Sequence, residues 1–169
     1  AGVLGWPISL VSLVDARRQF FKSSVGLPES LAAGRQTPLT HSFCKHVALS
    51  GEPLIVDDAR SHPVLKDNPA ISLGVIAYAG FPLTTQDGLV LGSFCAIDTV
   101  AREWSPEQLD ILRDLTASAM TEIELRRSNH ELRRANQAKD RFIAMLSHDL
   151  RTPLSPALLT AAELSQDPT

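Results

Sequence analysis

The N-terminal part of the chain consists of short apolar runs separated by clusters of polar residues, Gly and Pro. Residues 8–14 and 19–25 are two such runs on either side of a polar turn, and they predict a β-hairpin. Residues 75–84 and 89–97 are two longer runs, and an Asp-Gly pair at residues 87–88 lies between them. Asp-Gly between apolar runs is the strongest hairpin signal in the chain, so we expect antiparallel strands on both sides of it.

The segment between these two predicted hairpins is more mixed. Residues 26–40 are rich in Gly, Pro and polar side chains and predict a loop. Residues 42–49 have apolar positions at helical spacing, followed by Ser50-Gly51 as an end signal. Residues 53–56 predict a brief buried strand, and residues 59–73, with two prolines, predict irregular structure with short helical turns. Strands and helices of this kind indicate an α+β domain.

A long helix follows the predicted sheet. Ser105 is suited to the N-cap, Pro106 to the first helical position and Gln108 to a capping box. Neither Gly nor Pro occurs from Glu107 to Thr152. At a rise of 1.5 Å per residue, this segment would form a rod of roughly 70 Å.

Two apolar stripes of different phase lie along this helix. The first stripe should pack on the sheet or on the equivalent helix of a partner; it comprises Leu109, Leu112, Leu115, Ala119 and Ile123. The second, which we call the seam, has the alternating spacing of four and three of a heptad; it comprises Leu125, Asn129, Leu132, Asn136, Lys139, Ile143, Leu146 and Leu150. Asn129 and Asn136 fall at a positions, where Asn favours a parallel, in-register dimer. A solvated linker helix is the alternative for the charged part, residues 122–139.

Composition narrows the choice of partners and location. The chain has 169 residues and a net charge of −3, so neither nucleic acid nor an anionic membrane surface is an expected partner. No segment has the length and hydrophobicity of a membrane span. Cys44 and Cys95 match no metal-ligand spacing, so we expect buried free thiols, a reducing cytoplasmic location and no metal. The start at Ala1 and the end within a helical pattern at Thr169 suggest a piece of a longer protein.

A polar cluster interrupts the apolar pattern near the C-terminus. His148 and Thr152 are four residues apart and share a helix face, and Asp149 is next to His148. A lone His on a helix is most often a surface residue. However, residues 147–154, Ser-His-Asp-Leu-Arg-Thr-Pro-Leu, with the lead-in 142–144, resemble the H-box of sensor histidine kinases. The resemblance implies that His148 accepts a phosphoryl group, Asp149 orients the imidazole ring and takes up its proton, and Thr152 positions a water for dephosphorylation of a response regulator.

The remaining motifs resemble a GAF domain of the sensor-kinase type. The motifs that carry the resemblance are ISLVSLVD (8–15), SFCKH (42–46), PLIVDDA (53–59), YAGFPL (78–83) and LGSFCAID (91–98). The resemblance implies a central antiparallel sheet with flanking helices and a pocket beneath covering loops. Phe43, His46, Tyr78 and Phe81 are candidates to line that pocket, or they are plain core residues. The Cys-His pair of bilin-binding members and the cyclic-nucleotide signature are absent from the sequence, and the ligand is unassigned. The helix that usually precedes the first strand is absent too, so we expect one sheet face to be open or covered by a neighbour.

Together these features predict a three-part chain. Residues 1–104 form the GAF sensor domain, residues 105–139 its closing helix and a coiled-coil signalling helix, and residues 140–169 a truncated first helix of the dimerisation and phosphotransfer domain. The family resemblance implies ATP and Mg²⁺ in a catalytic domain beyond these residues, so the piece alone should be inactive. It also implies a parallel homodimer and a response-regulator receiver domain as partners. Two other classes remain open: a regulatory GAF ligand-binding dimer without kinase activity, and a coiled-coil adaptor.

Overall fold

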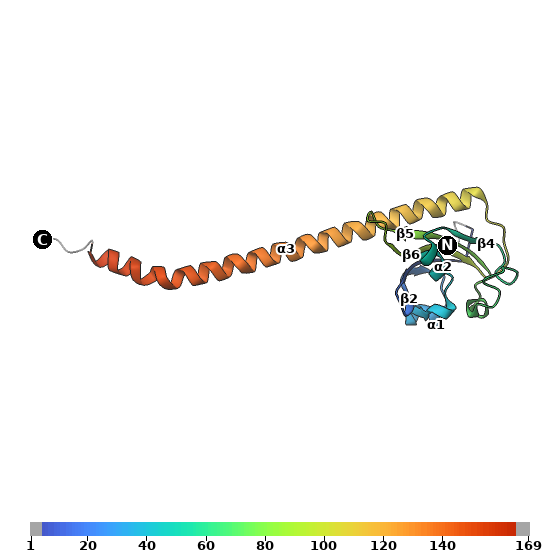
Figure 1. Ribbon diagram of the computed structural model, residues 1–169, viewed down its shortest axis with the longest axis horizontal. Coiled ribbons are helices and arrows are strands. Elements are labelled where there is room, and N and C mark those ends of the chain that lie inside the picture. The colour runs from blue at the N-terminus through green and yellow to red at the C-terminus, as the bar shows by residue number, and fades with distance from the viewer. Residues whose placement is uncertain (1–4, 165–169) are drawn as a thin grey trace. The chain divides into compact units, whose positions relative to one another are not determined.

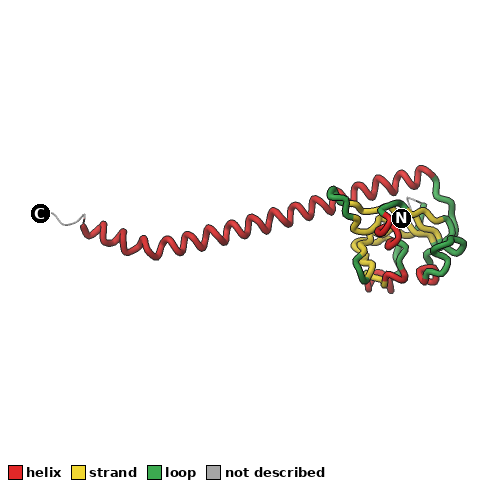
Figure 2. The backbone as a smooth tube through the Cα atoms, in the orientation of Figure 1, coloured by secondary structure: helices red, strands yellow, loops and turns green. Residues whose placement is uncertain are grey.

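The computed structural model describes residues 5–164, with the side chains of residues 5–149 (Figures 1 and 2). The chain divides into two compact units between Glu124 and Leu125. The first unit holds the sheet and is called the sensor unit below. The second unit is helical throughout its described part.

A six-stranded antiparallel sheet forms the centre of the sensor unit, with strand order β3-β2-β1-β6-β5-β4 over the described residues. The strands are β1 (Ile8–Val14), β2 (Arg18–Val25), β3 (Gln36–Pro38), β4 (Leu54–Val56), β5 (Ala77–Thr84) and β6 (Val90–Asp98). Both predicted hairpins, β1–β2 and β5–β6, are confirmed. At the second turn Gly88 has a φ of +81°, and its N–H donates to the carbonyl of Thr85 at 2.9 Å. The Asp-Gly pair therefore supplies the left-handed residue that the tight turn requires.

Helices cover the two faces of this sheet. They are α1 (Glu29–Gly34), α2 (Cys44–Ser50) and α3 (Pro106–Leu164), together with the 3₁₀ turns η2 (Leu39–His41) and η3 (Pro69–Leu73). The helix predicted over residues 42–49 is confirmed as α2, and Gly51 ends it in the left-handed conformation at φ 70°. The prediction of a loop over residues 26–40 is wrong, because α1 and β3 lie there.

The first face of the sheet packs against α2 and the irregular segments. Its core consists of apolar side chains from β1, β2, β4, β5, β6, α2 and η3 and from the segments between these elements. Phe43, Val47 and Leu65 are at most 3% exposed. Burying such side chains contributes about 1.5–3 kcal/mol each, so this face supplies much of the domain's stability.

The second face packs against the first turns of α3. Trp6, Trp104, Leu112 and Phe81 form a buried cluster with three alanines of β5 and β6. Leu109 and Leu112, the first two residues of the first stripe, therefore pack on the sheet of their own chain, and Thr116 and Met120 are the buried residues further along the helix. The expected open face is covered by α3 over β5 and β6.

The N-terminus of α3 has the predicted capping box. The N–H of Gln108 donates to Ser105 Oγ at 3.3 Å, and the N–H of Ser105 donates to Gln108 Oε1 at 3.2 Å. These reciprocal bonds satisfy two backbone donors that have no partner within the helix. The α+β fold with a central antiparallel sheet and a long C-terminal helix is thus confirmed.

Candidate functional site

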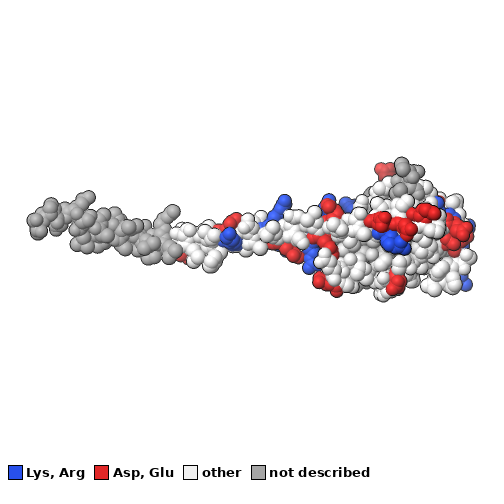
Figure 3. Space-filling model, turned by 90° about the horizontal axis from the view of Figure 1, so that it is seen from above, with Lys and Arg blue, Asp and Glu red and all other residues white. Residues whose placement is uncertain are grey.

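The second unit exposes apolar side chains at heptad spacing. Leu125, Leu132, Ile143 and Leu146 are between 42% and 69% exposed in the single chain. Charged side chains of both signs accompany them along the helix, on the face drawn in Figure 3. An exposed apolar stripe with mixed charges on its flanks is typical of a coiled-coil surface. The parallel pairing of this surface with the same surface of a second chain stays a prediction.

His148 and Asp149 lie next to each other on α3 and both reach solvent. Nδ1 of His148 is 3.3 Å from Oδ1 of Asp149, and the two side chains are 83% and 68% exposed. A carboxylate at Nδ1 favours the tautomer with its proton on that nitrogen, which leaves the lone pair on Nε2. The imidazole is therefore accessible and has a carboxylate beside it, and its role as phosphoacceptor stays a prediction.

Thr152, the third predicted residue of this site, falls on the same helix, one turn beyond His148. Its side chain lies outside the described side chains, so its role in positioning water stays a prediction.

A second His-acid pair precedes the first on the same helix, and sequence reasoning missed it. His130-Glu131-Leu132-Arg133 repeats the order His, acid, Leu, Arg of residues 148–151. The two histidines are eighteen positions apart, which equals about five turns and puts both on one helix face. The Glu131 carboxylate is engaged by Nε of Arg127 at 2.9 Å. The His130–Glu131 pair therefore offers a matched control for experiments on His148 and Asp149.

The sensor unit contains an inner cavity of about 40 Å³ between the first sheet face, α1, α2 and η3. Phe43 and Tyr78, two of the predicted pocket residues, both line it, and their rings meet edge to face at 5.5 Å between centroids. Gln19 and Thr37 line it as well and face each other across β2 and β3. Gln19 Oε1 and Thr37 Oγ1 are buried without a hydrogen-bond partner. Sequence reasoning missed these two residues, because only the register of a three-residue strand brings them together.

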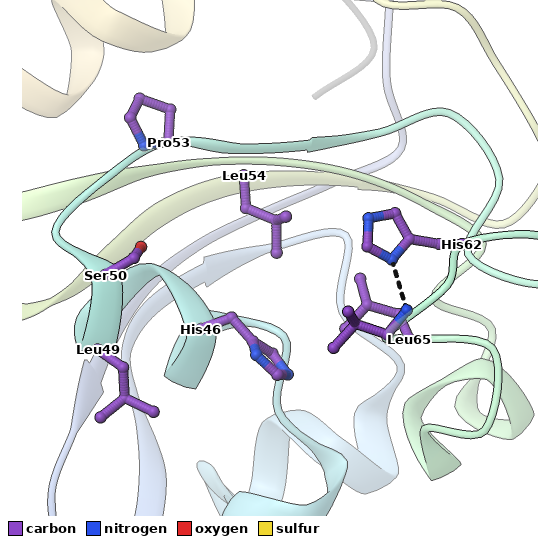
Figure 4. A pocket seen from close by; sticks show the side chains of 8 residues that line it. His46, Leu49, Ser50, Pro53, Leu54, His62 and Leu65 are labelled. Atoms are coloured by element: carbon purple, nitrogen blue, oxygen red, sulfur yellow. Dashed lines mark hydrogen bonds between the residues drawn. The ribbon is translucent and has the colours of Figure 1, made fainter.

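His46, the third predicted pocket residue, lies in a different pocket, of about 440 Å³ (Figure 4). Leu54, His62 and Leu65 also line this pocket, and His62 Nδ1 accepts a hydrogen bond from the N–H of Val64 at 3.3 Å. Burial lowers the pKa of His46, and the positive charges of Lys45 and His62 lower it further. Two imidazoles alone make an incomplete ligand set, and the described residues hold no group of three metal-ligating side chains.

Phe81, the fourth, lies on the opposite face of the sheet. It is 5% exposed, belongs to the cluster under α3 and has the Arg113 guanidinium 5.6 Å from its ring centroid. The structure thus brings Phe43 and Tyr78 together and places His46 and Phe81 elsewhere. Ligand binding by these residues stays a prediction.

Comparisons with known proteins agree with this arrangement. Residues 3–123 match the GAF domain family, and residues 138–169 match the His Kinase A (phospho-acceptor) domain. The second match contains His148 and Asp149. Among the described residues, no helix is long and apolar enough to span a membrane.

Two curated relatives share part of the chain. The chain is 42% identical over 98 residues to the cyclic di-GMP phosphodiesterase PA2567 of Pseudomonas aeruginosa; this covers 57% of the chain and 16% of that protein. It is also 42% identical over 57 residues to the cell-division control histidine kinase PdhS of Brucella ovis, which covers 34% of the chain and 5% of that protein. The chain therefore spans only a small part of the curated relatives it matches.

Solved structures share the fold of the sensor unit. The GAF domain of a phosphoenolpyruvate-protein phosphotransferase from Coxiella burnetii superposes with a TM-score of 0.62 at 20% identity, over 76% of this chain and 77% of that one. The second GAF domain of DevS from Mycobacterium smegmatis superposes with a TM-score of 0.59 at 19% identity, over 78% and 89% of the two chains. With a family match over residues 3–123, the sheet order described above and these structural neighbours, the chain belongs to the GAF domain family and continues into a His Kinase A phospho-acceptor segment.

Proposed function

We propose that the chain is the sensory and phosphoacceptor part of a two-component sensor histidine kinase, with His148 as the phosphorylated residue. The observation that carries the proposal is the exposed His148–Asp149 pair within the phospho-acceptor match. The large exposed fraction of the ring matters because two bulky partners must reach it in turn. These partners are a catalytic domain that delivers the phosphoryl group and a regulator that removes it.

The chemistry proposed for His148 is in-line phosphoryl transfer. Nε2 attacks the γ-phosphorus of ATP, the nitrogen–phosphorus bond forms, and the bond to the leaving ADP oxygen breaks. The ring becomes cationic during the attack, and the adjacent Asp149 carboxylate stabilises that charge and takes up the Nδ1 proton. Thr152 would position the water that later hydrolyses the phosphorylated Asp of the response regulator. The phosphoryl group then passes to an Asp of a response-regulator receiver domain.

Other parts of the activity are assigned to segments beyond these residues. ATP and Mg²⁺ would be held by a catalytic domain, so we expect the 169-residue chain alone to be inactive. Because ATP is the phosphoryl donor, a cytoplasmic location follows from the same proposal. His Kinase A domains of two-component systems are dimeric, and the exposed seam supports a parallel homodimer here.

A second candidate function is regulation by the GAF domain without kinase activity. The match to a cyclic di-GMP phosphodiesterase favours it, because that relative carries a similar segment in an enzyme of another class. In this reading the seam would dimerise the chain, and His148 would have no phosphorylated form.

Phosphorylation of the 169-residue chain in trans distinguishes the two. Purified chain is mixed with γ-labelled ATP, Mg²⁺ and the ATP-binding domain of a kinase of the PdhS type. We expect an acid-labile, base-stable label that is lost in His148→Gln. The matched control is His130→Gln, which removes an exposed His followed by an acidic residue on the same helix and should keep full labelling. Equal labelling of both variants would overturn the assignment of His148.

A further inference from the structure

The only two cysteines of the chain meet inside the sensor unit. Cys44 is the first residue of α2 and Cys95 lies within β6, fifty-one residues further along the chain. Their sulfur atoms are 3.8 Å apart, and the two residues are 2% and 0% exposed. Two thiols in contact can be joined as a disulfide when an oxidant takes up their two electrons.

The surroundings make the two thiols unequal. Tyr78 Oη donates a hydrogen bond to Cys44 Sγ at 3.4 Å and lies 3.2 Å from Ser93 Oγ. A hydrogen bond between the two thiols lowers the pKa of Cys44, against the effect of burial, and hydrogen bonds with Ser93 and Tyr78 lower it further. The same hydrogen bond and burial raise the pKa of Cys95. The Tyr78 hydroxyl, which donates to Cys44 Sγ, would stabilise a thiolate at Cys44, and the thiolate is the nucleophilic form of cysteine.

Cys44 also has access to a small molecule. It lines the inner cavity of about 40 Å³, whereas Cys95 is not among the residues that line it. A water needs roughly 10–15 Å³ of such volume, so the cavity accommodates a molecule of only a few heavy atoms. The unpartnered oxygens Gln19 Oε1 and Thr37 Oγ1 belong to residues of the same cavity and can accept hydrogen bonds from a hydroxylic guest.

We propose that Cys44 and Cys95 are a reversible oxidation site of the sensor unit, at which hydrogen peroxide converts the two thiols to an intramolecular disulfide. The Cys44 thiolate attacks one peroxide oxygen, the O–O bond breaks, and the released hydroxide takes up a proton to leave as water. Cys44 is then a sulfenic acid. The Cys95 sulfur attacks the Cys44 sulfur, and the sulfenic hydroxyl leaves as a second water with the Cys95 proton.

This reaction is balanced: two thiols and one peroxide give one disulfide and two waters. Cysteine is oxidised, the peroxide is reduced, and a dithiol reductant reverses the reaction. The sulfurs must approach each other from 3.8 Å to about 2 Å, a movement that a side-chain rotation and a small shift of the short helix α2 can provide. The inference concerns the sensor unit alone and is independent of phosphorylation at His148.

The test measures thiols in the intact 169-residue chain. Reduced protein is treated with hydrogen peroxide, quenched with a maleimide under denaturing conditions and weighed by mass spectrometry. We expect both thiols to disappear together, with a mass loss of two hydrogens, reversal by dithiothreitol, and a disulfide-linked peptide that contains both cysteines. The native chain should react at least about tenfold faster than the same chain unfolded in urea, because folding holds the sulfurs in contact. Retention of both thiols, or equal rates in the two states, would overturn the proposal.

Single variants assign the order of the two steps. Cys95→Ser should stop at a Cys44 sulfenic acid, which appears as a mass gain of one oxygen and is trapped by dimedone added with the denaturant, whereas Cys44→Ser should leave Cys95 unmodified. Tryptophan emission confirms the fold of each variant, and Cys44→Ala and Cys95→Ala replace any variant that fails to fold. Cumene hydroperoxide, which is too large for the cavity, should react at least about tenfold more slowly than hydrogen peroxide with the wild-type chain. A dimedone adduct on Cys95, or equal rates with both peroxides, contradicts the proposed path through the cavity.

Discussion

Two leucines on helix α3 differ only in what surrounds them, and replacing each with alanine separates folding from assembly. Leu112 is 0% exposed and packs between the sheet and α3, whereas Leu132 is 69% exposed on the seam. Both substitutions remove the same atoms and place a strong helix former in the helix. The environment alone therefore decides the outcome.

The buried site allows a numerical expectation. Leu→Ala in a packed core lowers the free energy of unfolding by about 2–5 kcal/mol. With a urea dependence of about 1.5 kcal/mol per molar, a loss of about 3 kcal/mol moves the unfolding midpoint by about 2 M. Leu132→Ala should change the intrinsic stability of the sensor unit by less than about 0.5 kcal/mol. It should instead weaken the dimer by about tenfold or more, because each chain loses an apolar seam contact.

Tryptophan emission is the suitable assay for Leu112→Ala. The only tryptophans, Trp6 and Trp104, lie in the same cluster as Leu112, with ring centroids 6.1 Å apart. Their emission therefore reports the loss of the packing that the substitution weakens. Dimerisation also stabilises a chain in a concentration-dependent way, so each urea titration is repeated at two protein concentrations and paired with light scattering. If Leu132→Ala lowers the tryptophan midpoint as much as Leu112→Ala does at both concentrations, the division into a packed stripe and an exposed seam is wrong.

Three further predictions test other parts of the chain. Gly92→Ala should lower the free energy of unfolding by about 3 kcal/mol or more, because its Cβ would lie 2.0 Å from the carbonyl oxygen of Ser12, whereas Gly34→Ala, with nothing within 4 Å, should be neutral in the same urea titration. Folding lowers the pKa of His46 from 6.5, so the folded chain binds a proton less readily than the unfolded chain. The free energy of unfolding should therefore fall as the pH drops below about 6.5. His46→Gln should flatten this dependence in urea titrations between about pH 8 and pH 5.5. Asp149→Asn should slow labelling of His148 roughly a hundredfold in the trans assay, whereas Thr152→Ala should spare labelling and impair only dephosphorylation of the regulator.

Local signals predicted those parts of the fold in which the deciding residues are neighbours in sequence. The Asp87-Gly88 turn and the Ser105–Gln108 capping box depend on contacts within a few residues, and both have the expected geometry. Strand β3 is different. It is three residues long and depends on pairing with β2, and the Arg35 guanidinium donates to backbone carbonyls of Phe21 and Lys22. Such contacts are distant in sequence, so the pattern over residues 26–40 indicated only a loop.

The pocket prediction shows a similar division. Tyr78 and Phe81 are three residues apart on β5, and an odd separation on a strand places two side chains on opposite faces. The alternation of side chains along a strand, applied to the sequence alone, would therefore have excluded Phe81 from a pocket that contains Tyr78. By contrast, the unpartnered oxygens of Gln19 and Thr37 and the contact between Cys44 and Cys95 follow from strand register and from the docking of α2. Nothing in the sequence around any of these residues marks them as neighbours.

A contact between the β5–β6 turn and helix α3 lies directly before the seam, and it permits a test of whether the helix stabilises the turn. The Glu124 carboxylate accepts hydrogen bonds from the backbone N–H and the side-chain amide of Gln86, both at 3.1 Å, so the β5–β6 turn is tied to the helix one residue before Leu125. Glu124→Ala removes both bonds. Because these bonds are solvent-exposed, the free energy of unfolding measured by urea titration should fall by no more than about 1 kcal/mol. The Gln86 amide should nevertheless exchange its hydrogen faster, since it loses its acceptor. The control is Glu131→Ala, which removes a carboxylate bonded to Arg127 on the same helix and should leave exchange at Gln86 unchanged. Unchanged exchange at Gln86 in Glu124→Ala would mean that the turn is held by its own hairpin and not by the helix.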